Sequence, residues 1–161
     1  MARPTRDDAL VMIELAQWHS QAGVAEALNW VRSDEFVTDY SGFNARHPAG
    51  SEGRLRTMKV FYFYETVGTL YKHNLFSEEL LFDWLDVAPV WNRMKGVGVD
   101  MRESVGSPRL WENFEALANA QVAGGRRTQK RTTRASRPAR ARATKKPARA
   151  TKAAKKTTRR R

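Results

Sequence analysis

The chain has 161 residues, a length that suits one domain plus an appendage. It contains no cysteine, which excludes disulfides, thiolate zinc sites and cysteine nucleophiles. Of its 29 Lys and Arg residues, 17 lie in residues 126–161, whereas all 17 Asp and Glu residues lie before residue 126. Residues 1–125 therefore carry a formal charge of −5 and residues 126–161 carry +17, which indicates a nucleic-acid or other anionic partner.

The N-terminal segment is predicted to be helical from Thr5 onward. Thr5 and Asp8 have the spacing of a capping box, in which each side chain satisfies a backbone N–H of the other residue. The residues that follow give this helix an apolar side, and they are Leu10, Ile13, Leu15 and Trp18. The charged N-terminus has no long apolar run behind it, so no secretory signal is expected.

Two shorter helices and a loop are predicted next. Gly23 marks a break, and apolar residues then recur three or four positions apart over residues 24–31. Ser33 resembles an N-cap and predicts a third helix as far as Tyr40. Over residues 42–53 the apolar pattern gives way to Gly, Pro and polar residues, which predicts a loop.

The most apolar segment of the chain runs from Leu55 to Leu75. Its aromatic run at residues 60–64 would suit a strand. The segment has no turn signal over about 20 residues, however, which is far beyond the length of a typical strand. Because apolar residues occur on nearly every side, we expect a central helix that is packed all round.

Two more helical segments are predicted before residue 100. Ser77 is expected to cap a helix with a buried stripe that ends at Ala88. Pro89 interrupts this pattern. One or two further turns are then expected before Gly96 and Gly98.

The last predicted helix begins at Ser107 and Pro108, which have the order of an N-cap and a proline at the first helical position. Its 3.6-residue pattern ends at residues 124–125, two glycines that predict a helix stop and a domain boundary. No convincing strand or hairpin signal is present. We therefore predict an all-α fold, with a compact bundle of five or six helices in residues 1–124 and a disordered polybasic tail in residues 125–161.

The tail has the composition of a disordered polycation. After Val122 its only apolar side chain is Ala, so burial cannot offset the entropy cost of ordering. Lys and Arg displace condensed counterions from nucleic-acid phosphates, and this drives binding that depends on salt and not on base sequence. The predicted nucleic-acid-binding residues are Arg126, Arg127, Lys130, Arg131, Arg134, Arg137, Arg140, Arg142, Lys145, Lys146, Arg149, Lys152, Lys155, Lys156, Arg159, Arg160 and Arg161.

The chemistry of the tail leaves several partners open. We expect DNA before RNA, although the tail has no obvious device for reading the 2′-hydroxyl group. An anionic membrane surface would attract the charges but would gain no insertion of apolar side chains. No stretch approaches 18 uncharged apolar residues, so no integral membrane segment is expected. We predict a cytoplasmic, nucleoid-associated protein.

No catalytic, cofactor or metal site is predicted. Glu65 lies among aromatic residues, and burial would make it a conceivable general acid or base. The alternatives are that it faces solvent or pairs with an arginine, for which the candidates are Arg56, Arg93 and Arg102. Asp83 and Asp86 could share a cation or belong to an exposed face. The three histidines lack the spacing of metal ligands.

Three stretches of the body, residues 56–68, 75–80 and 106–115, resemble an uncharacterised bacterial family of short helical proteins, a domain of unknown function. The resemblance covers roughly residues 30–120. It implies an all-α fold and supplies no activity. In composition, residues 126–161 resemble the extensions of linker histones and of bacterial nucleoid-associated proteins, which compact DNA without sequence preference.

Two functions follow from the sequence. The first is non-enzymatic, sequence-nonspecific binding of nucleic acid by the tail, with the helical domain as an interaction or oligomerisation module. The alternative is a protein-interaction adaptor whose tail targets RNA, ribosomes or an anionic membrane surface.

Overall fold

The structure, a computed structural model, describes the backbone of residues 3–135 and the side chains of residues 3–125. Within these residues it contains seven helices and no strand, which confirms the all-α prediction and exceeds the five or six helices expected. The helices are α1 (Arg6–Gln21), α2 (Val24–Arg32), α3 (Tyr40–Arg46), α4 (Glu52–Lys72), α5 (Glu78–Trp84), α6 (Val87–Ser104) and α7 (Glu112–Ala135). Residues 136–161, which make up most of the predicted disordered tail, lie outside the described residues.

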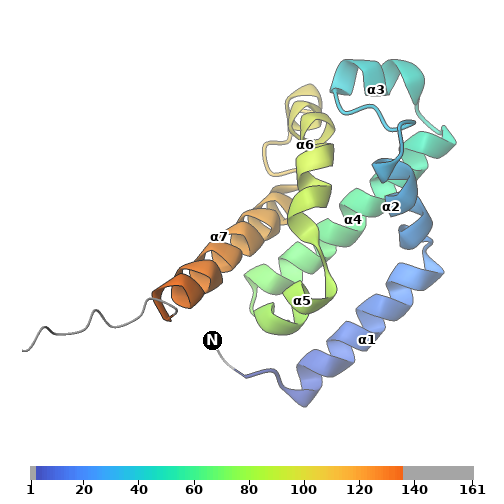
Figure 1. Ribbon diagram of the computed structural model, residues 1–161. Helices are drawn as coiled ribbons and strands as arrows, with labels where there is room; N and C mark the ends of the chain where they lie inside the picture. The colour runs from blue at the N-terminus through green and yellow to red at the C-terminus, as the bar shows by residue number, and fades with distance from the viewer. Residues whose placement is uncertain (1–2, 136–161) are drawn as a thin grey trace, which may run out of the picture.

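Helix α4 is the central element of the body and packs against both α2 and α7 (Figure 1). Phe61, Phe63 and Tyr64 are buried on it, as predicted for the apolar segment. The expectation that α4 is packed all round is wrong, because Leu55 and Tyr62 are 55% and 60% exposed. The ring of Tyr62 lies edge-on to a neighbouring tryptophan while much of its surface remains in solvent, as is common for amphipathic side chains. A continuous apolar run therefore does not imply burial on every side.

Helix α1 lies on the outside of the body. The capping box is confirmed, since the Thr5 hydroxyl accepts a hydrogen bond from the Asp8 backbone N–H and the Asp8 carboxylate accepts one from the Thr5 N–H. Of the predicted apolar side, however, only Leu15 is buried; Leu10 and Ile13 are 50% and 63% exposed. Apolar residues occur on two sides of this helix, and the sequence pattern alone does not say which side meets the core.

Two predictions for the segment between α2 and α4 are wrong. Ser33 does not begin a helix; its hydroxyl donates to the Trp30 carbonyl at 2.7 Å, so it closes the end of α2. The next helix, α3, begins at Tyr40, where we expected the third helix to end and a loop to follow over residues 42–53. Its N-cap is Asp39, whose carboxylate accepts from the Gly42 N–H at 2.7 Å. Serine satisfies helix carbonyls as well as helix N–H groups, which is why the position of the cap was misjudged.

Helix α6 runs through all three positions that were predicted to interrupt it. Pro89 is its third residue, where the missing N–H costs no helical hydrogen bond. Gly96 and Gly98 also lie within the helix, at positions where other groups approach the backbone closely. A Cβ on Gly96 would overlap the Thr38 carbonyl oxygen, and one on Gly98 would lie 3.0 Å from the Phe61 ring. These glycines allow close packing and do not end the helix.

Helix α7 also differs from its predicted bounds. It begins at Glu112 and not at Ser107–Pro108, and Trp111 just before it has a left-handed backbone with φ of 60°. It continues through Gly124–Gly125 to Ala135, so the predicted helix stop is wrong. Glycine costs about 1 kcal/mol in a helix, a penalty that a long helix tolerates. The domain boundary at residues 124–125 stays a prediction.

Candidate nucleic-acid interface

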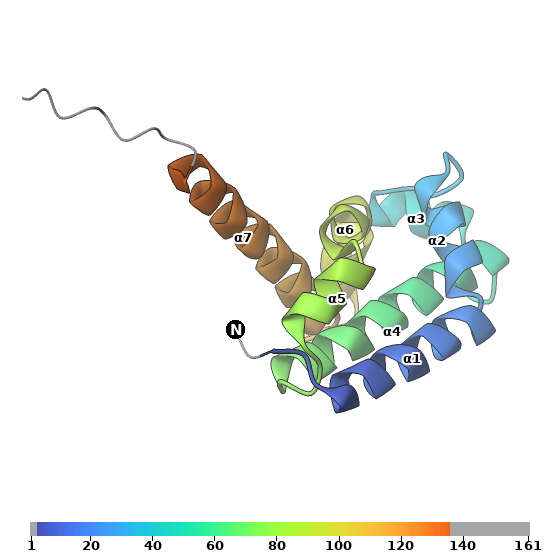
Figure 2. The same cartoon turned by 60° about the horizontal axis from the view of Figure 1, so that its bottom comes forward.

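Five of the predicted nucleic-acid-binding residues lie on α7. They are Arg126, Arg127, Lys130, Arg131 and Arg134. The other twelve cations belong to residues 136–161, outside the described part of the chain. Figure 2 shows that the C-terminal part of α7 projects from the body. The first basic residues are thus attached to a helix whose other end is part of the fold.

The N-terminus of α7 is held by Glu65 of α4. One carboxylate oxygen accepts from the Phe114 backbone N–H at 2.9 Å, and the other accepts from the Asn113 side-chain amide at 2.8 Å. A carboxylate at this position satisfies otherwise unpaired N–H groups and interacts favourably with the helix dipole. Glu65 therefore positions α7. The candidate arginines bind elsewhere: Arg56 to Glu52, Arg93 to backbone carbonyls and Arg102 to Glu115.

Aromatic packing fixes the same end of α7 in the core. Phe114 is fully buried and stacks on Tyr64, with ring centroids 4.7 Å apart and an interplanar angle of 13°. Trp111 stacks on Phe61 at 4.7 Å and 18°. Such pairs add about 0.5–1.5 kcal/mol to the burial of their surfaces. Burial also raises the pKa of Tyr64 to about 12, so its hydroxyl stays neutral in the physiological range.

Gln121 ties the middle of α7 to the start of α6. Its amide oxygen accepts from the Val87 and Ala88 backbone N–H groups, and its amide nitrogen donates to the Leu85 carbonyl, all at 2.8 Å. One side chain thereby satisfies three backbone groups where two helices meet. Because α7 is fixed at its N-terminus and again at Gln121, the body sets the direction in which the basic part of α7 leaves.

Three half-buried arginines of the body are engaged within the fold. Each donates to backbone carbonyls near the end of a helix or just before one. The pairs are Arg54 with His47 at 2.9 Å, Arg93 with Ser33 at 2.6 Å, and Arg102 with Trp111 at 3.1 Å. The guanidinium groups also lie over aromatic rings, of Phe43, Phe36 and Trp91 in turn. These three cations stabilise loop and helix ends and are not offered to a ligand.

Comparison with known proteins concerns this same body. The model of a family described as a domain of unknown function (DUF4760) matches residues 5–121. The chain belongs to this family. The match confirms the expected resemblance to an uncharacterised helical family, and it ends before the first of the 17 basic residues of the tail. No curated protein matches the chain, and no solved structure does.

On its surface the DUF4760 domain pairs several further cations with its own acids. Arg109 and Lys72 both bind the Glu112 carboxylate, at 2.9 Å and 3.2 Å. The hydrogen bond from Arg109, followed by the one from Lys72, lowers the pKa of Glu112. Arg56 forms an ion pair with Glu52 one turn away. Three surface cations are in this way paired with two carboxylates of the domain, which reduces the positive charge that the domain presents to phosphates.

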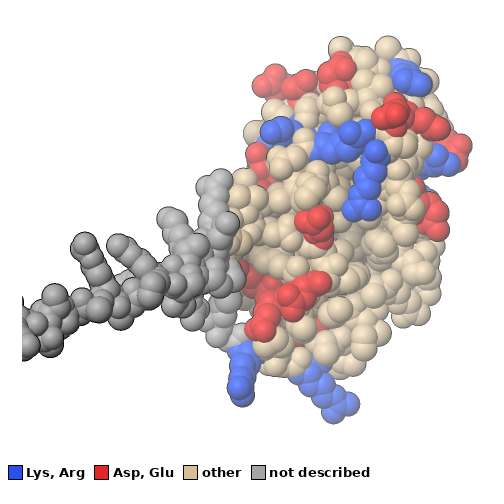
Figure 3. Space-filling view, in the orientation of Figure 1, with Lys and Arg blue, Asp and Glu red and all other residues tan. Residues whose placement is uncertain are grey.

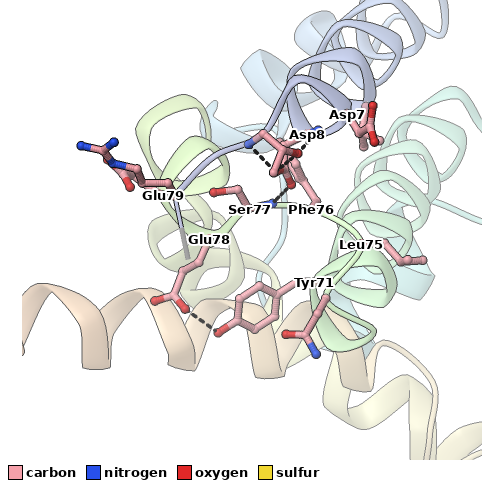
Figure 4. A pocket seen from close by; sticks show the side chains of 12 residues that line it. Asp7, Asp8, Tyr71, Leu75, Phe76, Ser77, Glu78 and Glu79 are labelled. Atoms are coloured by element: carbon pink, nitrogen blue, oxygen red, sulfur yellow. Dashed lines mark hydrogen bonds between the residues drawn. The ribbon is translucent and has the colours of Figure 1, made fainter. Parts of the chain in front are cut away.

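An acidic pocket lies between the start of α1 and the start of α5. It has a volume of about 570 Å³, and its polar lining includes Asp7, Asp8, Glu78 and Glu79 (Figure 4). The Asp8 carboxylate is fully engaged: it accepts from the Thr5 hydroxyl at 2.6 Å and from the Ser77 N–H at 2.7 Å. These bonds, that of the Thr5 side chain first, lower the pKa of Asp8. With four carboxylates against the single cation Arg3 in its lining, the pocket carries a net negative charge.

This acidic region lies beside the outgoing helix. Asp and Glu side chains gather over α5 (Figure 3). A Cβ on Gly124 of α7 would lie 3.8 Å from a carboxylate oxygen of Glu78. Phosphates are repelled from this face of the DUF4760 domain. The side on which α7 passes α5 is thus unsuited to nucleic acid.

The other predicted chemistry is not assembled by the fold. Among the residues that the structure describes, no three His, Cys, Asp or Glu side chains are grouped so as to hold a metal ion. The His19 ring packs on Phe63 with ring centroids 5.0 Å apart. Desolvation lowers the pKa of His19, and this effect outweighs the charge of Glu26, which acts to raise it. Asp83 and Asp86 are both exposed. In the described part of the chain, no helix combines the length and apolar content needed to cross a membrane.

Proposed function

We propose that this protein binds nucleic acid without sequence preference and without catalysis, and that its cations beyond residue 125 supply the affinity. DNA is the preferred partner, and the DUF4760 domain is the interaction or oligomerisation module of a cytoplasmic, nucleoid-associated protein. The observation that carries the proposal is the separation of charge, +17 after residue 125 against −5 before it. A dense run of Lys and Arg gains free energy by releasing the counterions condensed on phosphates.

The contacts within the body support the assignment of nucleic-acid binding to the residues after 125. Its half-buried arginines Arg54, Arg93 and Arg102 bind backbone carbonyls. Its acidic pocket would repel a phosphate backbone. We therefore assign the affinity for nucleic acid to the cations after residue 125, the first of which lie on the part of α7 that projects from the domain (Figure 2).

Removal of residues 126–161 is expected to abolish binding in moderate salt. The measurement is a salt-titrated binding curve of full-length protein and a 1–125 truncation, on random-sequence duplex DNA and on matched RNA. If roughly ten of the cations reach phosphates, log Kd should vary with log salt with a slope of about 9 in magnitude.

The control for this truncation is its thermal unfolding. The truncation keeps Glu65, Phe114 and Gln121, so its midpoint is expected to match that of the full-length protein. A folded truncation that still binds DNA in moderate salt would contradict the proposal.

A second candidate function is a protein-interaction adaptor whose tail targets RNA, ribosomes or an anionic membrane surface. The exposed Leu10 and Ile13, three positions apart on α1, favour it because they place apolar surface on one side of an outer helix. Affinity capture with and without nuclease separates the two functions. A protein partner that survives nuclease treatment supports the adaptor, whereas loss of all partners supports nucleic-acid binding.

A further inference from the structure

The pocket between α1 and α5 combines an acidic rim with an apolar wall. Its four carboxylates come from the first turns of the two helices, and the apolar part of its lining includes Val11, Leu75 and Phe76 (Figure 4). Leu75 is 59% exposed, so part of this apolar wall faces solvent. A long aliphatic stem with a cationic head, as in Lys and Arg, matches both parts of such a lining.

Two of the four carboxylates are used by the fold and two are open to a further cation. Asp8 caps α1 and accepts from the Ser77 N–H, and Glu78 accepts from the Tyr71 hydroxyl at 3.4 Å. Asp7 and Glu79 are exposed, and no ion pair within residues 3–125 neutralises either of them. These two carboxylates can pair with a cation without breaking a contact of the domain.

The chain leaves the domain past this pocket. A Cβ on Gly124 of α7 would lie 3.8 Å from a carboxylate oxygen of Glu78. From Gly124 to Ala135, the last residue of α7, the helix rises about 17 Å. The 26 residues that follow can span up to about 86 Å, at about 3.3 Å per residue. They are therefore long enough to return from the end of α7 to the pocket.

The charges of residues 136–161 complement those of the pocket. This segment carries 12 Lys and Arg residues and no Asp or Glu, whereas the pocket presents four carboxylates against Arg3. The attraction is of the same kind as the one that draws these cations to phosphates. Because both ends of the interaction belong to one chain, the effective concentration of the cations at the pocket is of the order of 1 mM.

We propose that residues 136–161 dock in the acidic pocket between α1 and α5 of their own chain, and that this docking competes with nucleic acid for their cations. The competition rests on the proposed function, whereas the docking itself rests on the pocket and on the charges. At an effective concentration of about 1 mM, a local affinity of about 0.1 mM keeps the pocket occupied for about nine tenths of the time. The apparent affinity for nucleic acid is then about tenfold weaker than that of the undocked chain.

The first test neutralises the two open carboxylates in the full-length chain. The pocket variant carries Asp7→Asn with Glu79→Gln. The control variant carries Asp100→Asn with Glu103→Gln, which removes two equally exposed charges from the last turns of α6. Each protein is titrated with random-sequence duplex DNA over a range of salt concentrations. The thermal unfolding midpoint is measured to verify that each domain is folded.

We expect the pocket variant to bind DNA about tenfold more tightly than the unaltered chain at low salt, because more of its cations are undocked. The control variant should lie within about twofold of the unaltered chain, since salt screens its distant charges. The difference between the pocket variant and the unaltered chain should shrink as salt is raised, because salt also weakens the docking.

The second test detects the docking directly and needs no nucleic acid. A carbodiimide joins a lysine to a carboxylate that it contacts, and mass spectrometry identifies the joined residues. We expect the lysines of residues 136–161 to be joined to Asp7, Glu78 and Glu79 in preference to the acids of α6, and duplex DNA to suppress these products. The lysines concerned are Lys145, Lys146, Lys152, Lys155 and Lys156. A mixture of isotope-labelled and unlabelled chains separates contacts within a chain from contacts between chains.

The two tests distinguish the inference from the proposed function. If the pocket variant binds DNA as the control variant does and the lysines are not joined to the pocket, the docking is refuted and the proposed function stands. If the joined residues belong only to different chains, the occupant is a second copy and docking within one chain is refuted. If the pocket products form within one chain but the unaltered chain binds no DNA, the docking is supported and the proposed function fails.

Discussion

Replacing Gly68 by alanine is expected to destabilise the domain by about 3 kcal/mol, because the added methyl group has no room between α4 and α7. A Cβ at this position would lie 2.6 Å from the carbonyl carbon of Asn113 and 3.0 Å from its Cβ. The backbone there cannot move aside freely, since the Phe114 N–H is bound by Glu65. Equilibrium unfolding in urea measures the loss, and the thermal midpoint should fall by about 10 °C.

The matched control for this substitution is Gly125→Ala. No atom lies within 4 Å of a Cβ built at Gly125, and alanine is the better helix former by about 1 kcal/mol. Its stability is therefore expected to equal or slightly exceed that of the unaltered protein. If Gly68→Ala unfolds at the same urea concentration as this control, α7 does not dock on α4 as closely as described.

The second large effect is expected for Glu65→Ala, with a loss of about 2–3 kcal/mol. The substitution leaves the Phe114 N–H without its acceptor, leaves the Asn113 side-chain amide with Thr69 alone, and removes a negative charge from the N-terminus of α7. Glu65→Gln keeps one acceptor without the charge, so its loss of stability should be intermediate. Urea unfolding of the two variants measures both contributions.

Glu52→Ala provides the comparison for this pair of variants. Glu52 is also a glutamate of α4, but its side chain is 76% exposed and forms an ion pair with Arg56 one turn away. Pairs of that kind contribute about 0.2–0.5 kcal/mol, so its removal should be nearly neutral. Equal losses for Glu65→Ala and Glu52→Ala would contradict the anchoring role assigned to Glu65.

Much of the fold was predictable because periodicity is a local signal. The helical nature of residues 55–72 followed from the length of the apolar run, and the start of α1 followed from the spacing of Thr5 and Asp8. Glycine was misjudged because its local and tertiary roles look alike in a sequence. Gly96 and Gly98 permit close approach of another segment, and nothing within α6 itself reveals that segment.

The candidate site was predictable in composition and not in geometry. The cations can be read directly from the sequence. The contacts that orient α7 join residues far apart in the chain: Glu65 and Asn113 are 48 positions apart, and Gln121 and Val87 are 34 positions apart. Such pairs depend on how helices pack, which no local pattern specifies. One signal was present and was missed: the four-residue spacing of Arg126, Lys130 and Arg134 predicts a one-sided helix once Gly124–Gly125 is not taken as a stop.

The uninterrupted course of α7 through Gly124–Gly125 also restricts how the gene can vary at this junction. In a coiled linker one inserted residue changes little, because closure entropy depends only weakly on length. In a helix the same insertion rotates everything after it by about 100° and advances it by about 1.5 Å. Insertions or deletions near a whole turn, of three or four residues, keep the phase between the two halves. Relatives that carry a basic extension are therefore expected to differ in length here by such steps and not by one or two residues.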